Sequence, residues 1–531
     1  MTIRNSIFAL ILAGLLLLSA PFPARATQTK TLNFSWSTNV GPLNPHLYSP
    51  NQMFAQAMVY EPLVRYGEGG RIIPWLAESW TVSPDGRVYT FALRKGVRFS
   101  DGTPFDATAV KANFDAVLKN RKRHDWLEFI AQIEKTEVLG SHSFRLTLKE
   151  SYYPVLQELA LIRPMRFLAP SAFPEDGNTA QGIKAPIGTG PWKLVEIRKG
   201  EYDLFEANEL YWGEKPAYRQ VRVKVIPDSD GRAIAFDTGA VDLIYGAGGH
   251  GSGQIGLDTF KRYRDTPQLQ TGVSQPLATR TLALNSGRFP TDDLAVRKAI
   301  LHGVNKQAII EHIFLGVERL ADTLFSPEMP YCNLGLAPFG FDPVQAAALL
   351  DAAGWHKGAG SPYRSKEGRE LTLDLCFVGN NSLQKSVAEV IQSDLKHIGI
   401  KVRLVGEEKD SFRARQKSGE FGLIFGDTWG APYDPHSFCS SMRVPAHADY
   451  QAQSGLAMKA EIDRKIGAVL VSVDEAQRQE LYREILTTLH EEAVYLPLSY
   501  MTNIYVHGPK LAQVPFGGTK YEIPFEQLRG E

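Results

Sequence analysis

Residues 371–404, LTLDLCFVGNNSLQKSVAEVIQSDLKHIGIKVRL, contain the pattern that decides the fold. Apolar and polar side chains alternate over 371–375 and again over 400–404, which predicts two strands. Between them, residues 384–398 carry apolar side chains at helical spacing, and Gly399 stands where a helix ends. A strand, a helix and a strand in this order favour a parallel pair of strands. This half of the chain is therefore expected to be α/β.

Further elements of both kinds flank this unit. Helical patterns cover residues 342–353 and 474–492, and Ser472 and Glu475 have the spacing of a capping box ahead of the second helix. Alternating stretches predict strands nearer the N-terminus, at residues 89–94, 144–149 and 221–225. The sequence therefore indicates a mixed α and β protein, without an internal repeat or a low-complexity segment.

The length and composition set limits on the protein's class. A chain of 531 residues exceeds what one hydrophobic core supports, so two or three domains are expected. Its 58 basic and 58 acidic residues balance, and a neutral chain has no overall field that attracts nucleic acid or an anionic membrane. The three cysteines, Cys332, Cys376 and Cys439, are widely spaced. A disulfide framework is not expected at this size, although one pair could oxidise in an exported protein.

Residues 1–26 have the layout of a secretory signal peptide. Arg4 gives a positive start, residues 7–20 are almost entirely apolar, and a small-x-small cleavage pattern follows them. The apolar run is shorter than the about 20 residues that span a bilayer, which argues against the alternative of a membrane anchor. We expect a mature chain that begins near Thr27, lies free in the periplasm and has two fewer basic than acidic residues.

Sequence motifs of catalytic sites are absent. The chain has no G-x-S-x-G, no H-E-x-x-H, no Walker loop and no Cys/His cluster with zinc spacing. Catalytic triads are assembled from residues far apart in sequence, so a hydrolase that acts on a ligand in a cleft remains an alternative hypothesis. Turnover of a bound compound would support that reading. We expect a binding protein rather than an enzyme.

Two stretches carry a resemblance to a known family. Residues 80–104 read WTVSPDGRVYTFALRKGVRFSDGTP, and residues 186–192 read PIGTGPW, followed by YWG at 211–213. They resemble the peptide/nickel class of bacterial extracellular solute-binding proteins, which are the capture subunits of ABC importers. The likeness covers nearly all of the mature chain. Within the class, the stretches at 429–436 and 441–449 are more similar to the nickel binders than to the peptide binders.

This resemblance implies the architecture. The implied fold is α/β and two-lobed, of the class II periplasmic-binding-protein type, with an extra subdomain in the first lobe and the ligand in the cleft. The first lobe would comprise residues 27–272 with 501–531, and the extra subdomain residues 71–184. The second lobe would comprise residues 273–500, which include the strand–helix–strand unit found from the sequence pattern.

The resemblance also implies a function, namely capture of nickel and delivery to the permease of an inner-membrane ABC importer. Imidazole and carboxylate groups suit nickel, yet the sequence has no His/Cys/Asp cluster with ligand spacing. The family resolves this by binding Ni²⁺ already held by a small carboxylate chelator, such as free histidine. A di- or oligopeptide receptor on the same scaffold is the alternative, and cobalt is not distinguished from nickel. A monomer without a nucleic-acid partner is expected.

Residues that match the family acquire expected roles. Arg163 and Arg123 would bind chelator carboxylates through the guanidinium fork, with surface salt bridges as the alternative. His447 would be the one direct metal ligand, although a lone loop histidine is more often solvated. Tyr521 stands where a small hydroxyl residue is expected, which leaves the chelator open. The other residues expected in the cleft are Tyr48, Met53, Trp126, Trp429 and Tyr433. They would enclose the complex, and the alternative for each is ordinary packing in the core.

Overall fold

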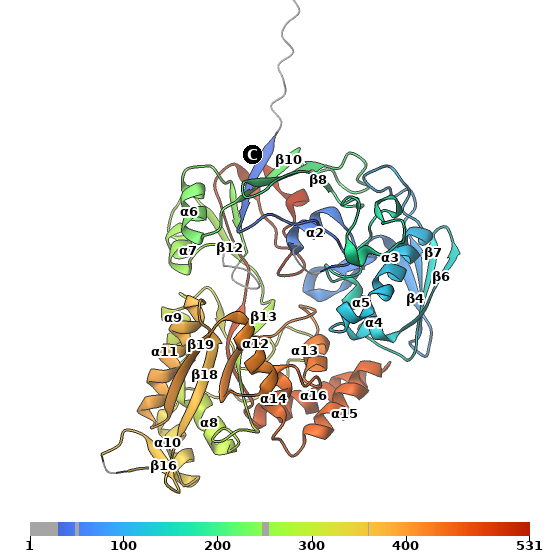
Figure 1. Ribbon diagram of the computed structural model, residues 1–531. Coiled ribbons are helices and arrows are strands. Elements are labelled where there is room, and N and C mark those ends of the chain that lie inside the picture. The colour runs from blue at the N-terminus through green and yellow to red at the C-terminus, as the bar shows by residue number, and fades with distance from the viewer. Residues whose placement is uncertain (1–29, 48–51, 247–253, 359, 531) are drawn as a thin grey trace, which may run out of the picture.

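A computed structural model describes residues 30–47, 52–246, 254–358 and 360–530 and folds them into two lobes (Figure 1). The expected signal peptide and Tyr48 lie outside the described residues. Within the described ranges, every helix is too short or too polar to cross a bilayer.

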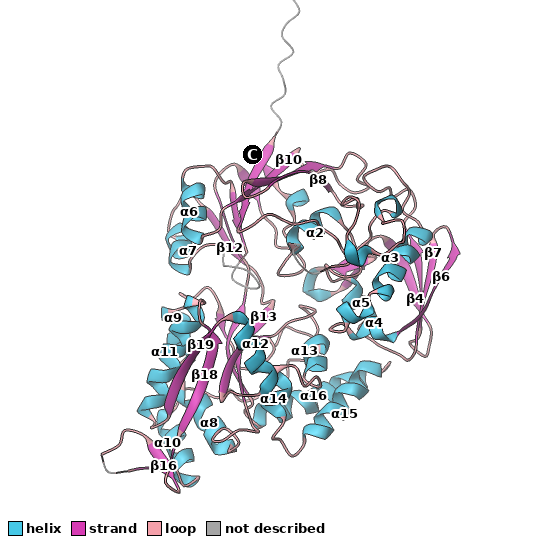
Figure 2. Cartoon of the chain, in the orientation of Figure 1, coloured by secondary structure: helices cyan, strands magenta, loops and turns pink. Residues whose placement is uncertain are grey.

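The second lobe is built on a six-stranded mixed sheet (Figure 2). In spatial order the strands are β14 (Arg319–Leu320), β21 (Tyr495–Met501), β13 (Ala278–Leu284), β20 (Leu423–Asp427), β18 (Thr372–Val378) and β19 (Lys401–Glu407). β18 and β19 pair in parallel, and α11 (Ser382–His397) connects them. Gly399 follows α11 with a φ of +88°, a conformation that glycine adopts without strain. The predicted strand–helix–strand unit is therefore confirmed.

The second lobe also contains helices. They are α8 (Leu294–Gly303), α9 (Lys306–His312), α10 (Pro343–Ala352), α12 (Lys409–Ser418), α13 (His436–Ser441), α14 (Ala448–Gln453), α15 (Lys459–Val471) and α16 (Glu475–Glu491). The capping box predicted from Ser472 and Glu475 is wrong. Asp474 is the N-cap of α16, and its carboxylate accepts a hydrogen bond from the Gln477 amide at 3.0 Å. A carboxylate two residues later in the chain reaches the exposed amide groups of the first turn directly, so the serine is not needed there.

Two sheets lie in the first lobe outside its extra subdomain, besides two-stranded pairs. The four-stranded sheet is ordered β1 (Thr31–Trp36), β10 (Gln220–Val225), β9 (Tyr202–Ala207) and β8 (Trp192–Arg198). The three-stranded sheet is ordered β11 (Leu243–Tyr245), β22 (Ile504–His507) and β12 (Gln270–Val273). Its helices include α2 (Met53–Val59), α6 (Ser229–Asp237) and α7 (Leu257–Arg264). Because β22 lies late in the chain, the C-terminal segment returns to the first lobe after the second has been formed (Figure 1).

An antiparallel sheet between residues 77 and 148 forms the extra subdomain of the first lobe (Figure 1). Its order is β4 (Ala77–Val82), β5 (Val88–Leu93), β7 (Ser143–Leu148) and β6 (Ile133–Gly140). Its helices are α3 (Ala107–Lys119), α4 (Glu128–Gln132) and α5 (Val155–Leu159). The strands predicted at 89–94, 144–149 and 221–225 are thus present as β5, β7 and β10. The limits proposed for the lobes and the subdomain stay a prediction.

Two segments cross between the lobes side by side. Residues 274–277 connect β12 to β13, and residues 502–503 connect β21 to β22. The Ser274 amide donates to the Asn503 carbonyl at 2.8 Å, and the Asn503 amide donates to the Ser274 hydroxyl at 2.8 Å. Away from these segments, the apolar core of the extra subdomain continues into that of the second lobe, for example from Leu159 to Phe438. The lobes therefore touch along one side and are linked by two short segments that run side by side.

Candidate ligand-binding site

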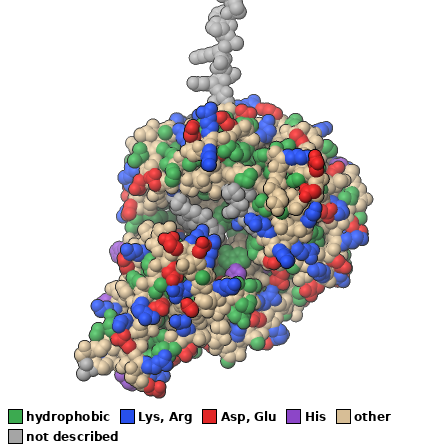
Figure 3. Space-filling view, in the orientation of Figure 1, with side chains coloured by type: hydrophobic (Ala, Val, Ile, Leu, Met, Phe, Trp, Pro, Cys, Tyr) green, Lys and Arg blue, Asp and Glu red, His purple; other side chains and the backbone are tan. Residues whose placement is uncertain are grey.

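A cavity of about 280 Å³ lies where the lobes and the two crossing segments meet. On the face drawn in Figure 3 the molecule is hollowed between the lobes, and hydrophobic side chains are visible in the hollow. The first lobe contributes Met53, Trp126, Leu161, Ile162 and Arg163 to the wall. The second lobe contributes Phe325, Met329, Trp429 and Asp434, among others, and the C-terminal segment contributes Thr519, Lys520 and Tyr521.

Four of the residues expected at the site meet in this cavity: Met53, Trp126, Arg163 and Trp429. Arg123 and Tyr433 do not line it. Arg123 lies in an exposed turn three residues before Trp126. The Tyr433 ring packs 5.3 Å from that of Tyr66, at the contact between the lobes. Their roles in ligand binding stay predictions.

A column of rings connects His447 to the cavity. The Trp126 and Trp429 rings lie 6.2 Å apart, tilted by 56°, and the His447 ring stacks on Trp429 at 5.9 Å and 21°. His447 is the N-cap of α14 and does not itself line the cavity. Burial lowers the pKa of His447, which favours the neutral imidazole that a metal needs. Among the described residues, no hydrogen-bond partner reaches its ring nitrogens, so both remain available.

A buried arginine holds the Arg163 segment in place. The Arg166 guanidinium donates to the carbonyl groups of Leu161 and Tyr60, each at 3.1 Å, and pairs with Glu522 at 3.5 Å. It therefore ties the turn that carries Arg163 to the C-terminal segment. No local pattern in the sequence indicates this role, because Arg166 lies in an apolar stretch and its carboxylate partner is 356 residues away.

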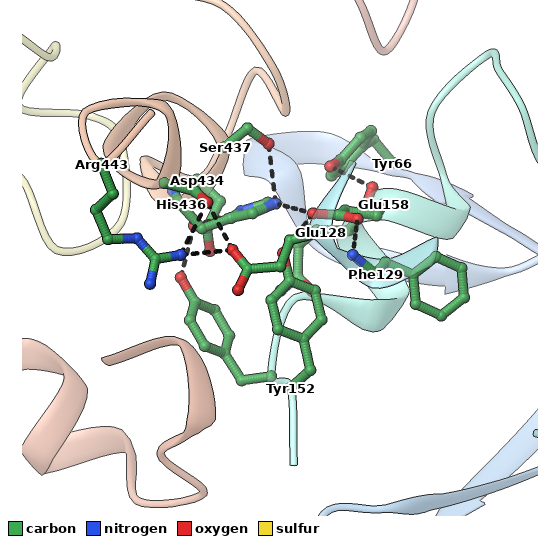
Figure 4. Close-up of polar contacts among 12 residues, drawn as sticks. Tyr66, Glu128, Phe129, Tyr152, Glu158, Asp434, His436, Ser437 and Arg443 are labelled. Carbon is green, nitrogen blue, oxygen red and sulfur yellow. Dashed lines mark hydrogen bonds and ion pairs between the residues drawn. The ribbon is translucent and has the colours of Figure 1, made fainter. Parts of the chain in front are cut away.

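Buried polar groups join the two lobes beside the cavity (Figure 4). His436 Nδ1 lies 2.8 Å from Asp434 Oδ1, and its Nε2 lies 3.1 Å from Glu158 Oε1. The Tyr152 hydroxyl donates to the same Glu158 oxygen at 2.6 Å, and the Tyr153 hydroxyl donates to Asp434 at 2.7 Å. Glu158 belongs to the first lobe, whereas Asp434 and His436 belong to the second. We call Glu158, His436 and Asp434 the interlobe clasp.

The clasp contains a charged imidazolium. Burial disfavours the charge on His436, but attraction and hydrogen bonds from Asp434 and Glu158 outweigh it and raise the pKa of His436 to about 9. A second ion pair across the lobes joins Arg443 to Glu128 at 2.6 Å, at half-buried positions. Contact between the lobes is therefore strengthened by charge next to the ligand cavity.

We expect the stability of the protein to fall as the pH rises from about 6.5 to about 9. Because the pKa of His436 is higher in the folded chain than its ordinary value of 6.5, its contribution is complete below that value and is lost as the pH passes through 9. At about 1.4 kcal/mol per pH unit the loss approaches about 3 kcal/mol. Thermal unfolding across this range measures it, and a constant Tm would contradict the prediction.

Acid should also destabilise the protein, because two other buried histidines have pKa values that are lowered rather than raised. Burial lowers the pKa values of His46 and His124 to about 4. The unfolded chain therefore binds these protons more tightly, and stability is lost as the pH falls from 6.5 towards 4. The same series of melts, extended to acid, should place the maximum Tm near pH 6.5.

The donor groups needed for a metal are sparse. Within the described ranges, no three His, Cys, Asp or Glu side chains gather in a way that could hold a metal ion. Cys332, Cys376 and Cys439 are buried, and each carries a free thiol.

Comparisons with known proteins place these features in a family. The profile of bacterial extracellular solute-binding proteins, family 5 middle, matches residues 71–450. The nickel-binding periplasmic protein of Escherichia coli (strain K12) is 53% identical over 528 residues, covering 99% of each chain. The crystal structure of NikA from Brucella suis in complex with Fe(III)-EDTA matches with a TM-score of 0.92 at 57% identity, covering 94% of this chain and 100% of that one. The dipeptide-binding protein of Escherichia coli (strain K12) is 26% identical over 511 residues, covering 90% of this chain and 91% of that protein.

Proposed function

The chain belongs to family 5 of the bacterial extracellular solute-binding proteins, and on that premise we propose that it captures nickel, held by a small carboxylate chelator, in the periplasm. It then delivers this complex to the permease of an inner-membrane ABC importer. The observation that carries the proposal is the cavity between the lobes, where Arg163 meets the Trp126 and Trp429 rings, in a chain alike over its whole length to a nickel-binding relative.

The chemistry of the cavity supports a chelated metal rather than a bare ion. Nickel prefers several nitrogen and oxygen ligands, and the described residues supply no cluster of them. A chelator provides most of these ligands and adds carboxylates, which Arg163 binds through two parallel hydrogen bonds. The tryptophan rings cover the apolar parts of the complex and exclude water. His447 adds at most one direct bond to the metal.

A peptide receptor is the less favoured alternative. Such a receptor needs a free carboxylate in the second lobe for the amino group of the peptide. Asp434 lines the cavity, but its Oδ1 already accepts from Tyr153 and His436. The dipeptide-binding relative is also much more distant than the nickel-binding one. The proposal includes no catalysis, so bound chelator should be recovered chemically unchanged.

Protein isolated from the periplasm without added metal tests the proposal. Elemental analysis and native mass spectrometry should give one nickel for each monomer, with the extra mass of a small polycarboxylate. The intact mass should correspond to a chain that begins near Thr27. A metal-free protein that carries a peptide would overturn the proposal in favour of the peptide receptor.

Replacing His447 with Ala should weaken the binding of nickel with L-histidine by about tenfold, because one metal–imidazole bond is lost. Isothermal titration calorimetry on the metal-free protein measures this, and a thermal melt checks the fold. His397→Ala, an exposed histidine of α11, is the matched control and should bind normally. An unchanged affinity of His447→Ala would remove His447 as a ligand.

A further inference from the structure

A lysine from the C-terminal segment forms part of the cavity wall. Lys520 lines the cavity together with Thr519 and Tyr521. Glu522, in the same segment, pairs with Arg166, and Arg166 in turn holds the turn that carries Arg163. Its backbone is fixed, because the Lys520 carbonyl accepts a hydrogen bond from the Asn503 side chain at 3.0 Å. Asn503 is itself in one of the two segments that cross between the lobes.

The Lys520 ammonium has no carboxylate partner among the described residues. Asp434 lies in the same wall and Glu522 lies two residues along the chain, and both are engaged elsewhere. Glu522 pairs with Arg166, and Asp434 accepts from Tyr153 and His436. The ammonium instead lies 5.1 Å from the centre of the Tyr521 ring, a cation–π contact that holds it at the wall without neutralising it.

Two cationic side chains, Arg163 and Lys520, line the cavity. Asp434 is the acidic residue among the described residues of its wall, and it is committed to the interlobe clasp. Apolar rings around a small space lower the local dielectric, so a carboxylate bound there is attracted to the Lys520 ammonium more strongly than in water. A complex with a net negative charge gains more from this attraction than a neutral complex does.

We propose that Lys520 is a second carboxylate-binding group of this cavity and that it selects metal chelates with net negative charge. The inference rests on the proposed function and narrows it, because it names the charge class of the cargo. A chelator with carboxylates on two sides of the metal would contact Arg163 with one and Lys520 with the other. Tyr521 positions the ammonium for this contact.

Calorimetry with two nickel complexes of different charge tests the proposal. Nickel–EDTA is doubly negative, and nickel with two L-histidine molecules is neutral. Lys520→Met keeps the length of the side chain and removes its charge, so it should weaken nickel–EDTA binding by roughly tenfold and nickel–histidine binding by about twofold or less. Lys520→Arg should retain affinity for nickel–EDTA. Lys95→Met, at an exposed position outside the cavity, should change neither affinity.

The outcomes separate this inference from the function on which it rests. Wild-type protein that binds neither complex would overturn the proposed function and this inference together. Wild-type binding with equal affinities in Lys520→Met would overturn the role of Lys520 alone. An equal loss of affinity for both complexes would make Lys520 a structural residue, and so would a lower melting temperature that explains the loss. Either result would also overturn the proposed role of Lys520.

Discussion

Replacing Arg163 with Met should weaken the binding of nickel–EDTA by about a hundredfold or more. The guanidinium lines the cavity and can donate two parallel hydrogen bonds to one carboxylate. Hydrogen bonds to charged groups contribute about 1.5–3 kcal/mol each, and the chelator carboxylate would be left without a partner in a cavity lined by aromatic rings. Calorimetry on the metal-free protein measures the change.

Two variants sharpen the test of Arg163. Arg163→Lys keeps the charge but not the planar fork, so it should recover only part of the affinity. Arg123→Met is the comparison, because Arg123 is the other arginine expected to bind a chelator carboxylate and comes from the same lobe, but does not line the cavity. It should change the affinity by about threefold or less and act mainly on the association rate. Binding that survives Arg163→Met and is lost in Arg123→Met would reverse the assignment.

Replacing His436 with Leu should lower the free energy of unfolding by about 3–5 kcal/mol, because Asp434 and Glu158 would remain buried without their shared cation. All three side chains of the clasp are at most 3% exposed. Urea unfolding measures the loss. The fall in Tm between pH 6.5 and about 9 should also disappear, since the group that titrates there is gone.

A partial rescue distinguishes charge from packing in the clasp. In the double variant Glu158→Gln with His436→Leu, one uncompensated charge is removed, so part of the lost stability should return. His490→Leu replaces a half-buried histidine that hydrogen-bonds the Ala337 carbonyl group and packs on the Phe339 ring, without a carboxylate partner among the described residues, and should destabilise the protein far less. If His436→Leu lowers the free energy of unfolding by no more than His490→Leu does, the clasp is not ionised.

Strands with one face nearer to solvent were predictable from the sequence, whereas strands buried on both faces were not. Residues 371–375, at the start of β18, alternate between buried and half-buried positions, which produces the pattern that predicted this strand. β13 and β21 are buried at every position, so they lack alternation and were not predicted. The cavity residues Trp126, Arg163 and Trp429 were found through resemblance, since no periodic signal marks them.

Residues that act through distant partners were missed. Lys520 lies in an irregular segment, and Arg166 and Glu158 bond to residues several hundred positions away. Such pairings follow from the fold as a whole and leave no trace in local spacing. His436 likewise gains its structural role from the clasp, where it contacts one carboxylate from each lobe.

The order in which the wall residues occur along the chain has a consequence for the proposed export. Residues 519–521 come after every other described residue of the cavity wall. A chain that emerges from a translocation pore with its N-terminus first would release all of those other residues before its cavity is complete. A molecule clipped before Thr519 would lack the Lys520 side of the wall, so it should hold the proposed cargo more weakly than the full-length chain.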